Sequence, residues 1–356
     1  MLKICFCNTM KSWGGGEKWH YEMAKALSER GYDVHFILTL GSEIDKRIKE
    51  NKIIPHYLKV ANLSFLDPFK HKKLVTFFRN QGFDALLVNN PTELKLVAPA
   101  AKRAGIKKII YRRGSDVVVK KKILNQIVFE KIVTDIIANS NATRSSLLYS
   151  GMNIADKITV INNGIHPPKE SGSQQVLTDN QTIIIGAVGR LSKEKGFHHL
   201  ISIAKILTDN GKDFKIKIAG RGGQRSELEK QISENGLHGK VELVGFINNV
   251  YDFLGNCDIF ALPSRYEGFG YVMVEAMFTK KPIVAFEISA AKEIVIHGQT
   301  GLLAKPFDLN DFANHLMTLM DNKNLCRKFG LQGEKKAYEN YLFDKSVDKI
   351  LKLITN

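Results

Sequence analysis

The sequence predicts an α/β protein with two similar halves, each a parallel sheet of the doubly wound type with helices on its faces. First, 356 residues suffice for two domains that each bury a core. Second, short apolar runs alternate with glycine-bounded loops and helical periodicity, which indicates βαβ units. Third, the same pattern begins again near residue 183. In such sheets we expect a ligand crevice at the carboxyl ends of the strands.

The first half opens with a strand, a glycine loop and a helix. Residues 2–7 form an apolar run that breaks at Gly14-Gly15-Gly16, and 17–31 continue with apolar residues at helical spacing. A second strand at 34–38 completes a βαβ unit. Further strands are predicted at 85–88, 108–111 and 135–138. The first half is therefore predicted to contain a parallel sheet.

The second half repeats this plan after a polar stretch. Residues 167–182 are rich in Pro, Ser, Gln and Asn, and we interpret them as an interdomain linker. An apolar strand follows at 183–189, and a helix at 197–207 precedes a strand at 214–219. The final segment, 341–355, has apolar residues along one helical face.

The composition is that of an ordinary globular protein. It is 44% hydrophobic and 25% charged, which excludes disordered, collagen-like and coiled-coil chains. The four cysteines form neither a disulfide framework nor a paired CxxC site, so we expect a reducing cytoplasm. Cys5 and Cys7 are predicted to share the core face of a strand. No apolar run approaches the ~18 residues of a membrane-spanning helix.

The net charge of +16 is concentrated in the first half of the chain. Residues 1–168 carry 27 Lys and Arg against 14 Asp and Glu, a net charge of +13, whereas 169–356 carry 25 against 22, a net charge of +3. Such an excess indicates nucleic acid, an anionic membrane surface or an acidic substrate as partner, or else a solubilising surface. Nucleic acid is disfavoured because no recognition motif is present and no aromatic residues interleave with the basic run at 119–122.

The most informative motif is D-I-F-A-L-P-S-R-Y-E-G-F-G-Y-V-M-V-E-A at 258–276. A buried strand is predicted to end at Pro263, and a helix begins near Gly270 with its N–H groups directed at the loop between them. Glu267 lies in that loop and Glu275 lies inside the helix. The arrangement predicts an anion cradle flanked by acids. Taken alone, Glu275 would be interpreted as a solvated helix residue.

Glycine-rich loops follow other strands as well. The loop 189–196 carries Arg190 and Lys195, a pair suited to a diphosphate because Arg offers a planar fork and Lys a mobile charge. By itself, its Lys-Glu-Lys run is typical of solvated surface. Similar turns occur at 14–16 and 220–223, and glycine loops in phase with strand ends favour phosphate binding. None has the dinucleotide fingerprint or a Walker Lys-Ser pair, which disfavours simple NAD and P-loop chemistry.

Together these motifs resemble the retaining GT-B glycosyltransferases of family 4. The resemblance rests on S-R-Y-E-G-F-G-Y-V-M-V-E-A-M, V-G-R-L-S-K-E-K-G, G-G-G-E near the N-terminus and I-N-N-G-I at 161–165, and it spans nearly the whole chain. It implies a GT-B architecture, with two doubly wound Rossmann-like domains facing a central cleft. The acceptor domain would cover 1–168 and the nucleotide-sugar donor domain 169–340, with the terminal helix 341–356 crossing back to the first domain.

The resemblance also implies residue roles. Arg190 and Lys195 would bind the donor diphosphate, Glu267 would hydrogen-bond sugar hydroxyls, and Glu275 would bind the ribose. Backbone amides, close glycine approaches and a base-contacting strand end would supply the remaining donor-binding positions: Gly15, Gly16, Gly189, Gly220, Val244, Phe246, Gly268, Phe269 and Gly270.

The sequence departs from the family pattern at 109–116, where it reads I-I-Y-R-R-G-S-D. Many relatives carry a His-Asp pair or similar there, and an arginine cannot act as a general base at neutral pH. Either Arg113 contributes to catalysis by stabilising the leaving-group charge or the acceptor, as we expect, or this part of the site is aligned differently with the family. The alternative that Arg112 and Arg113 are residues at a strand end without a functional role stays open. The role of Asp116 is open as well.

The expected reaction is front-face transfer of a sugar from a nucleotide sugar, with UDP as the default nucleotide because it is commoner in the family. No Asp-x-Asp triplet is present, so neither a metal nor another cofactor is expected. The expected acceptor is a glycan or lipid-linked molecule of bacterial-type polysaccharide or lipopolysaccharide synthesis. The alternatives are a non-catalytic GT-B protein that binds sugars or nucleotides and, less favoured, a basic nucleic-acid-binding protein.

Basic residues of the first half suggest where the enzyme acts. They would draw it to an anionic membrane surface, so that a cytoplasmic protein associates peripherally with the inner face of the membrane. The residues concerned are Lys70, Lys72, Lys73, Lys107, Lys108, Arg112, Arg113, Lys120, Lys121 and Lys122.

Overall fold

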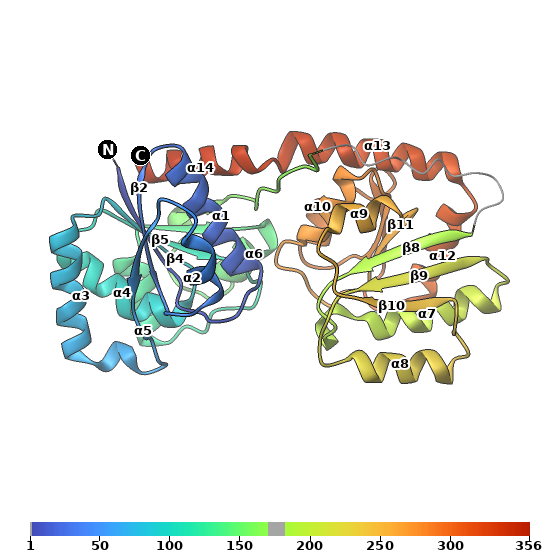
Figure 1. Ribbon diagram of the computed structural model, residues 1–356, viewed down its shortest axis with the longest axis horizontal. Coiled ribbons are helices and arrows are strands. Elements are labelled where there is room, and N and C mark those ends of the chain that lie inside the picture. The colour runs from blue at the N-terminus through green and yellow to red at the C-terminus, as the bar shows by residue number, and fades with distance from the viewer. Residues whose placement is uncertain (1, 170–181) are drawn as a thin grey trace. The chain divides into compact units, whose positions relative to one another are not determined.

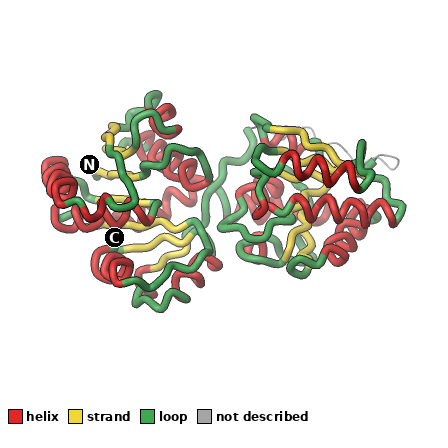
Figure 2. Tube along the Cα trace, turned by 90° about the horizontal axis from the view of Figure 1, so that it is seen from below, coloured by secondary structure: helices red, strands yellow, loops and turns green. Residues whose placement is uncertain are grey.

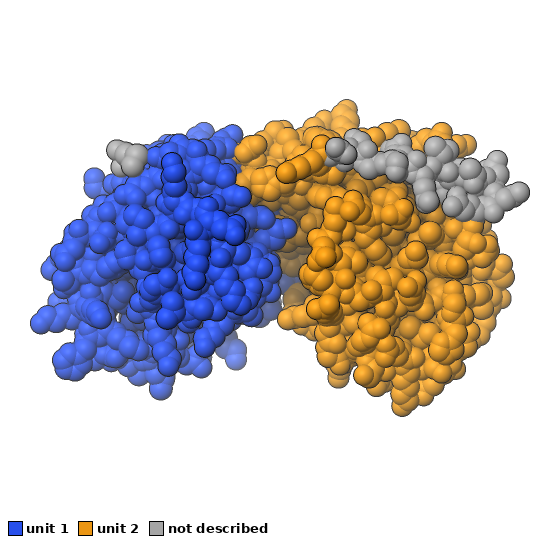
Figure 3. Space-filling model, viewed as in Figure 1, with its two compact units in different colours: residues 1–163, 346–356 blue, residues 164–345 orange. Residues whose placement is uncertain are grey.

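The computed structural model describes residues 2–169 and 182–356, and it divides into two compact units (Figure 3). Unit 1 consists of Met1–Asn163 and Ser346–Asn356, and unit 2 of Gly164–Lys345. Most of the linker predicted at 167–182 lies outside the described residues. The last eleven residues of the chain therefore belong with its N-terminal part.

Unit 1 contains a seven-stranded parallel sheet in the order β3-β2-β1-β4-β5-β6-β7, with helices on both faces (Figure 1). Its elements in chain order are β1 (Lys3–Cys7), α1 (Gly15–Glu29), β2 (Asp33–Leu38), α2 (Glu43–Ile48), β3 (Ile54–Tyr57), the 3₁₀-helix η1 (Ser64–Leu66), α3 (Pro68–Gln81), β4 (Ala85–Val88), α4 (Pro91–Ala104), β5 (Lys108–Arg113), α5 (Ile123–Gln126), the π-helix η2 (Ile127–Ile132), β6 (Asp135–Ala138), α6 (Asn141–Leu148), the 3₁₀-helix η3 (Ala155–Lys157) and β7 (Ile158–Val160).

Unit 2 contains a six-stranded parallel sheet in the order β10-β9-β8-β11-β12-β13, and Figure 2 shows helices around the strands of both units. Its elements, followed by the terminal helix, are β8 (Ile183–Val188), the 3₁₀-helix η4 (Lys193–Lys195), α7 (Phe197–Asp209), β9 (Phe214–Ala219), α8 (Arg225–Glu234), β10 (Val241–Gly245), α9 (Val250–Gly255), β11 (Ile259–Leu262), α10 (Tyr271–Phe278), β12 (Ile283–Phe286), α11 (Ala291–Ile294), β13 (Gly301–Ala304), α12 (Leu309–Met320), α13 (Lys323–Asn340) and α14 (Phe343–Thr355).

The central strands of both sheets, such as β1, β4, β11 and β12, are buried on their two faces, which explains their nearly uninterrupted apolar sequences. In β11, Ile259 and Ala261 enter the core beneath α7 and α12, whereas Phe260 and Leu262 enter the core beneath α9 and α10. The predicted α/β class, with two doubly wound parallel sheets, is confirmed. The prediction that Cys5 and Cys7 share the core face of one strand is confirmed as well.

The strand order of each sheet reverses at one place, and this feature positions the candidate site. In unit 2 the reversal lies between β8 and β11, which pair in parallel through Ile185 and Ile259. Since parallel strands end at the same edge of a sheet, the loops after β8 and β11 are neighbours there. In unit 1 the same reversal lies between β1 and β4.

The terminal helix α14 has the apolar face that the sequence predicts. Val347, Ile350 and Ile354 are buried along it. The Ser346 hydroxyl donates a hydrogen bond to the Asn162 carbonyl, 3.1 Å away. No helix among the described residues is both long enough and apolar enough to cross a membrane.

Candidate functional site

In unit 2 the loops after β8 and β11 touch through their backbones. Gly196, at the end of the first loop, has φ +66°, and a Cβ atom there would lie 2.0 Å from the Pro263 carbonyl oxygen. The Arg265 amide donates a hydrogen bond of 2.8 Å to the Glu194 carbonyl. Because Gly196 has no side chain, the two loops can approach this closely.

This approach brings Lys195 and Glu267 together. Lys195 Nζ lies 2.5 Å from Glu267 Oε1, and the Ser264 hydroxyl donates a hydrogen bond of 2.7 Å to the same oxygen. The Lys195 stem runs over Gly189, where an added Cβ would lie 3.4 Å from Lys195 Cδ. Glu267 is buried, so its carboxylate depends on these two donors. The sequence predicted Lys195 and Glu267 but missed Ser264.

Arg190 is held differently from Lys195. Its guanidinium Nη2 lies 2.9 Å from Glu194 Oε1, and its side chain is 71% exposed. An exposed ion pair of this kind contributes little free energy, so Arg190 can exchange Glu194 for a more highly charged ligand at low cost. The structure thus places both predicted cations in one loop but pairs only Lys195 with Glu267.

The helix α10 begins where the sequence predicts. Gly270 has φ +84° at the N-cap, and α10 starts at the next residue. Its N-terminal N–H groups and the helix dipole make this end suited to an anion. Phe269 packs against Tyr271 and Tyr341 and is buried, so only its backbone is available to a ligand. Glu275 is also buried, unlike a solvated helix residue.

A third loop, after β9, completes the edge of the sheet. A Cβ at Gly220 would lie 1.8 Å from the Gly189 carbonyl oxygen, so this glycine permits the β8 and β9 ends to meet. The Arg221 guanidinium lies 5.1 Å from the centre of the exposed Phe246 ring. Val244 is partly buried against the core behind it. Phe246 was predicted from the sequence, whereas Arg221 was not, although it lies between Gly220 and Gly222 in a predicted glycine loop.

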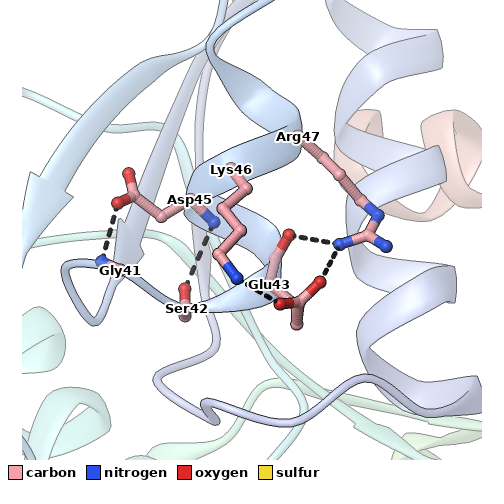
Figure 4. A network of polar contacts seen from close by, with 6 residues as sticks. All are labelled: Gly41, Ser42, Glu43, Asp45, Lys46 and Arg47. Atoms are coloured by element: carbon pink, nitrogen blue, oxygen red, sulfur yellow. Dashed lines mark hydrogen bonds and ion pairs between the residues drawn. The ribbon is translucent and has the colours of Figure 1, made fainter.

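Unit 1 has its own polar edge after β1 and β4. Gly15 and Gly16 form the first turn of α1, and a Cβ at Gly16 would lie 2.5 Å from Asn89 Nδ2. Just before them, the Trp13 ring lies 4.0 Å from the Arg47 guanidinium carbon. Arg47 is held in turn by Glu43, within the network that caps α2 (Figure 4).

The two arginines at the end of β5 are both engaged. Arg112 is buried and donates hydrogen bonds to Asn89, 3.1 Å away, and to Asn163, 2.9 Å away. Arg113 donates to the carbonyl oxygens of Ser115 and Val117 at 3.1 and 2.7 Å. These bonds hold the loop after β5, and the catalytic role of Arg113 stays a prediction.

Glu93, on the first turn of α4, is a titratable residue that was not predicted from the sequence. Its Oε1 accepts hydrogen bonds from the Thr9 amide (2.6 Å) and the Thr9 hydroxyl (2.8 Å), and Oε2 has no hydrogen-bond partner among the described residues. Burial raises the pKa of Glu93 to about 7 against the opposing effect of Thr9, and the Glu17 charge adds to the rise. No sequence pattern marks it, because its pKa depends on burial.

The geometry of unit 2 is suited to a ligand with both phosphate and sugar groups. Lys195, Arg190, Arg221 and the start of α10 supply positive charge at one sheet edge, and Glu267 supplies a buried hydrogen-bond acceptor there. Arg113, Gly15 and Gly16 belong to unit 1.

Comparisons with known proteins agree with this geometry. A family model described as Glycosyltransferase Family 4 matches residues 13–168, and one described as Glycosyl transferases group 1 matches residues 168–336. The capsular polysaccharide biosynthesis glycosyltransferase CapM of Staphylococcus aureus is 28% identical over 342 residues, which cover 88% of this chain and 87% of CapM.

A second relative and a solved structure extend the likeness over the full length. The N-acetylgalactosamine-N,N'-diacetylbacillosaminyl-diphospho-undecaprenol 4-alpha-N-acetylgalactosaminyltransferase of Campylobacter jejuni is 28% identical and covers 92% of this chain and 90% of its own. The structure of Anabaena Alr3699/HepE with UDP and glucose matches with a TM-score of 0.83 at 23% identity, over 100% of both chains. The chain therefore belongs to glycosyltransferase family 4 and is a glycosyltransferase with the GT-B fold.

Proposed function

We propose that this enzyme transfers a sugar, with retention of anomeric configuration, from a nucleotide sugar to a glycan or lipid-linked acceptor. UDP is the proposed nucleotide, because the similar HepE binds UDP and glucose. The pathway proposed is synthesis of a cell-surface polysaccharide or lipopolysaccharide, because one relative acts in capsular polysaccharide biosynthesis and another on a diphospho-undecaprenol substrate.

The proposed step breaks one bond and forms one on the same face of the sugar. The bond between the anomeric carbon and the β-phosphate oxygen breaks, and the acceptor oxygen bonds to that carbon. The acceptor proton passes to the departing phosphate oxygen, so the products are the glycosylated acceptor and a nucleoside diphosphate. The enzyme then contributes positioning and charge stabilisation.

The observation that carries this proposal is the contact between Lys195 and Glu267 where the strand order reverses. Lys195 Nζ, 2.5 Å from Glu267 Oε1, is held at the carboxyl edge beside the start of α10. Glu267 accepts hydrogen bonds from Lys195 and Ser264 and has further lone pairs for sugar hydroxyls. Lys195 and Arg190 can neutralise the departing diphosphate, so we propose that the reaction needs no metal or other cofactor.

We further propose that the enzyme works on the cytoplasmic side of an anionic membrane, bound through its basic half. The structure separates the cations that the sequence grouped. Arg112 is buried, and Lys108 pairs with Asp135 at 3.3 Å. The lysines between 70 and 73 and between 120 and 122 stand on loops and helices outside the sheet.

The proposed function is tested by donor binding and turnover. Thermal-shift measurements with UDP, GDP and ADP sugars identify the donor, since a ligand at 100 times its Kd stabilises by ~2.7 kcal/mol. With that donor and a lipid-linked glycan extract, Lys195→Ala is expected to slow release of nucleoside diphosphate by roughly 100-fold or more, as removal of an oxyanion-hole donor does. NMR of the transferred sugar then reports its anomeric configuration.

Lys193→Ala is the matched control, because Lys193 is an exposed lysine of the same loop. It is expected to keep the wild-type rate and stability. Lys195→Ala removes a donor from the buried Glu267 carboxylate and should also lower the unfolding free energy, so both rates are measured under conditions where denaturation curves show each variant to be folded. Near wild-type turnover in Lys195→Ala would reject the site. Donor binding without turnover under all acceptor conditions would favour a non-catalytic sugar-binding protein instead.

A further inference from the structure

Two segments of unit 1 expose large apolar side chains beside lysines. The first, residues 61–73, presents Leu63, Leu66 and Phe69, and the Phe69 side chain is 83% exposed. The second, residues 117–127, presents Val117, Val118 and Ile123, with Ile123 80% exposed. Isolated exposed apolar residues are normal, but two groups of them beside basic residues indicate an interaction surface.

Both segments lie at one edge and on one face of the unit 1 sheet. The first follows β3 and the second follows β5, so both leave the carboxyl ends of parallel strands. The helix α4 packs against η1 in the first segment, against α3 and against η2 after the second. We call the combined surface, residues 61–73 and 117–127, the carboxyl-edge rim.

The exposed apolar side chains of the two segments cannot rotate into the core, because side chains next to them in sequence already fill the core positions there. Phe65 in the first segment and Val119 and Leu124 in the second pack against the same hydrophobic core. Asp67 caps α3 by accepting hydrogen bonds of 3.0 Å from the amides of Phe69 and Lys70. The local structure therefore keeps Leu66, Phe69 and Ile123 facing outward.

The charge around these side chains is nearly all positive. Residues 68–83 and 117–129 contain no Asp or Glu, and the cations among them are Lys70, Lys72, Lys73, Arg79, Lys120, Lys121 and Lys122. Asp67 is the one acid among residues 58–83. Protein–protein interfaces are depleted in lysine, whereas surfaces that bind anionic bilayers combine lysines with Phe and Leu.

We propose that the carboxyl-edge rim docks this enzyme on a bilayer leaflet that contains anionic lipids, with Leu63, Leu66 and Phe69 entering the interface. This inference rests on the proposed membrane association and names the surface responsible. A groove of about 490 Å³ runs along the same face of α3, between Phe69, Lys72, Lys73, Thr76, Phe77 and Asn80. Its lysines and aromatic rings suit the phosphate and glycerol parts of a lipid headgroup.

Vesicle sedimentation tests the two contributions separately. The wild-type enzyme is expected to bind phosphatidylcholine vesicles containing phosphatidylglycerol and not pure phosphatidylcholine vesicles. Lys70→Gln/Lys72→Gln/Lys73→Gln should weaken binding by roughly 100-fold, at ~1 kcal/mol per lysine. Leu63→Ser/Leu66→Ser/Phe69→Ser keeps the charge and should still weaken it by roughly tenfold or more. The control Lys46→Gln/Lys49→Gln/Lys52→Gln removes equal charge from exposed lysines around α2 and should bind more tightly than the Lys70/Lys72/Lys73 variant.

Insertion is measured directly with a tryptophan in place of Phe69. In Phe69→Trp, fluorescence should be quenched by brominated anionic vesicles. The control Leu331→Trp places an indole ring at a half-exposed position of α13, in unit 2 and outside the carboxyl-edge rim. It should show no added quenching. Trp13 and Trp19 give the same background in both variants.

The possible outcomes distinguish the rim from the wider proposal. If wild-type protein fails to bind anionic vesicles, the proposed membrane association and the rim both fail. If it binds but the serine variant binds equally well, or Phe69→Trp is not quenched, membrane association holds and the rim assignment is overturned. A concentration-dependent dimer in vesicle-free sedimentation that Phe69→Ser abolishes would assign the surface to self-association and also overturn the inference.

Discussion

The carboxyl group of Glu93 binds the loop that follows β1, so its protonation state affects the contact with that loop. Its Oε1 accepts both hydrogen bonds from Thr9, five residues before Gly14 and the start of α1. Burial raises the pKa of Glu93 from its ordinary value of 4.5 to about 7. Near neutral pH the folded enzyme therefore holds a mixture of protonated and ionised Glu93, although the unfolded chain is almost fully ionised there.

The stability of the enzyme should depend on pH through this group. Because the pKa is raised in the folded state, its stabilising contribution is complete below about pH 4.5 and is lost as the pH rises through about 7. Glu93→Gln keeps an acceptor for Thr9 and mimics the protonated acid. We expect the unfolding free energy of the variant, relative to wild type, to rise by about 2–3 kcal/mol between about pH 5 and about pH 8.

Urea denaturation of both proteins at several pH values checks this prediction. Glu29→Gln serves as the control, since Glu29 is an exposed glutamate of α1. Its difference from wild type should stay nearly constant across the same range. A constant difference for Glu93→Gln as well would show that the folded enzyme does not retain the proton.

The loops of unit 2 are held together by glycines whose missing side chains make room for other backbones. Gly196 meets Pro263, Gly220 meets Gly189, and Gly222 meets Leu191, each with a virtual Cβ between 1.8 and 2.2 Å from a carbonyl oxygen. The close approach of three strand ends therefore depends on residues that do no chemistry. The salt bridge between Lys195 and Glu267 is one consequence of that approach.

Gly196→Ala tests this dependence. Both the positive φ and the contact with Pro263 oppose a Cβ, so the β8 and β11 loops must separate and Lys195 must lose its position. We expect a loss of turnover well beyond the loss of stability. Gly211→Ala is the matched control, because Gly211 has φ +70° but open space around its Cβ position. Gly211→Ala should lower the free energy of unfolding only by the ~1–2 kcal/mol that a non-glycine residue costs in a left-handed backbone conformation, and it should leave turnover intact. Equal turnover in the two variants would contradict the proposed coupling.

The sequence predicts those elements whose signal is local. Strands 85–88 and 135–138 agree with β4 and β6 because these are short, largely buried apolar runs. The strand 214–219 agrees with β9, in which buried Phe214, Ile216 and Ile218 alternate with Lys215 and Lys217. By contrast, β3 escaped prediction because it is a four-residue edge strand with Pro55 inside it. In the candidate site, Lys195 and Glu267 could be predicted from motif spacing. Ser264 lies three residues before Glu267 in the same motif, but the sequence does not show that its hydroxyl binds that carboxylate. Glu93 could not be predicted, because its burial and its contact with Thr9, far away in the sequence, arise only in the fold.

Unit 1 is built from two stretches of the chain that lie far apart in the sequence. Residues 346–356 belong to the unit formed by 1–163, although the whole of unit 2 lies between them in sequence. Val347 and Ile350 are completely buried in this segment, and Asp348 forms an ion pair of 2.6 Å with Arg30 on α1. Unit 1 therefore cannot reach this structure until residues 346–356 have been synthesised.

A substitution at the end of the chain should consequently destabilise its beginning. Ile350→Ala removes a fully buried side chain from α14 and should lower the unfolding free energy of unit 1 by about 2–5 kcal/mol. Both tryptophans, Trp13 and Trp19, lie in unit 1, so intrinsic fluorescence reports on that unit. Leu331→Ala, at a half-exposed position of α13 in unit 2, is the control and should leave the fluorescence transition within about 0.5 kcal/mol of wild type. An unshifted transition in Ile350→Ala would mean that α14 contributes nothing to unit 1, and the discontinuous organisation of the unit would then have no energetic basis.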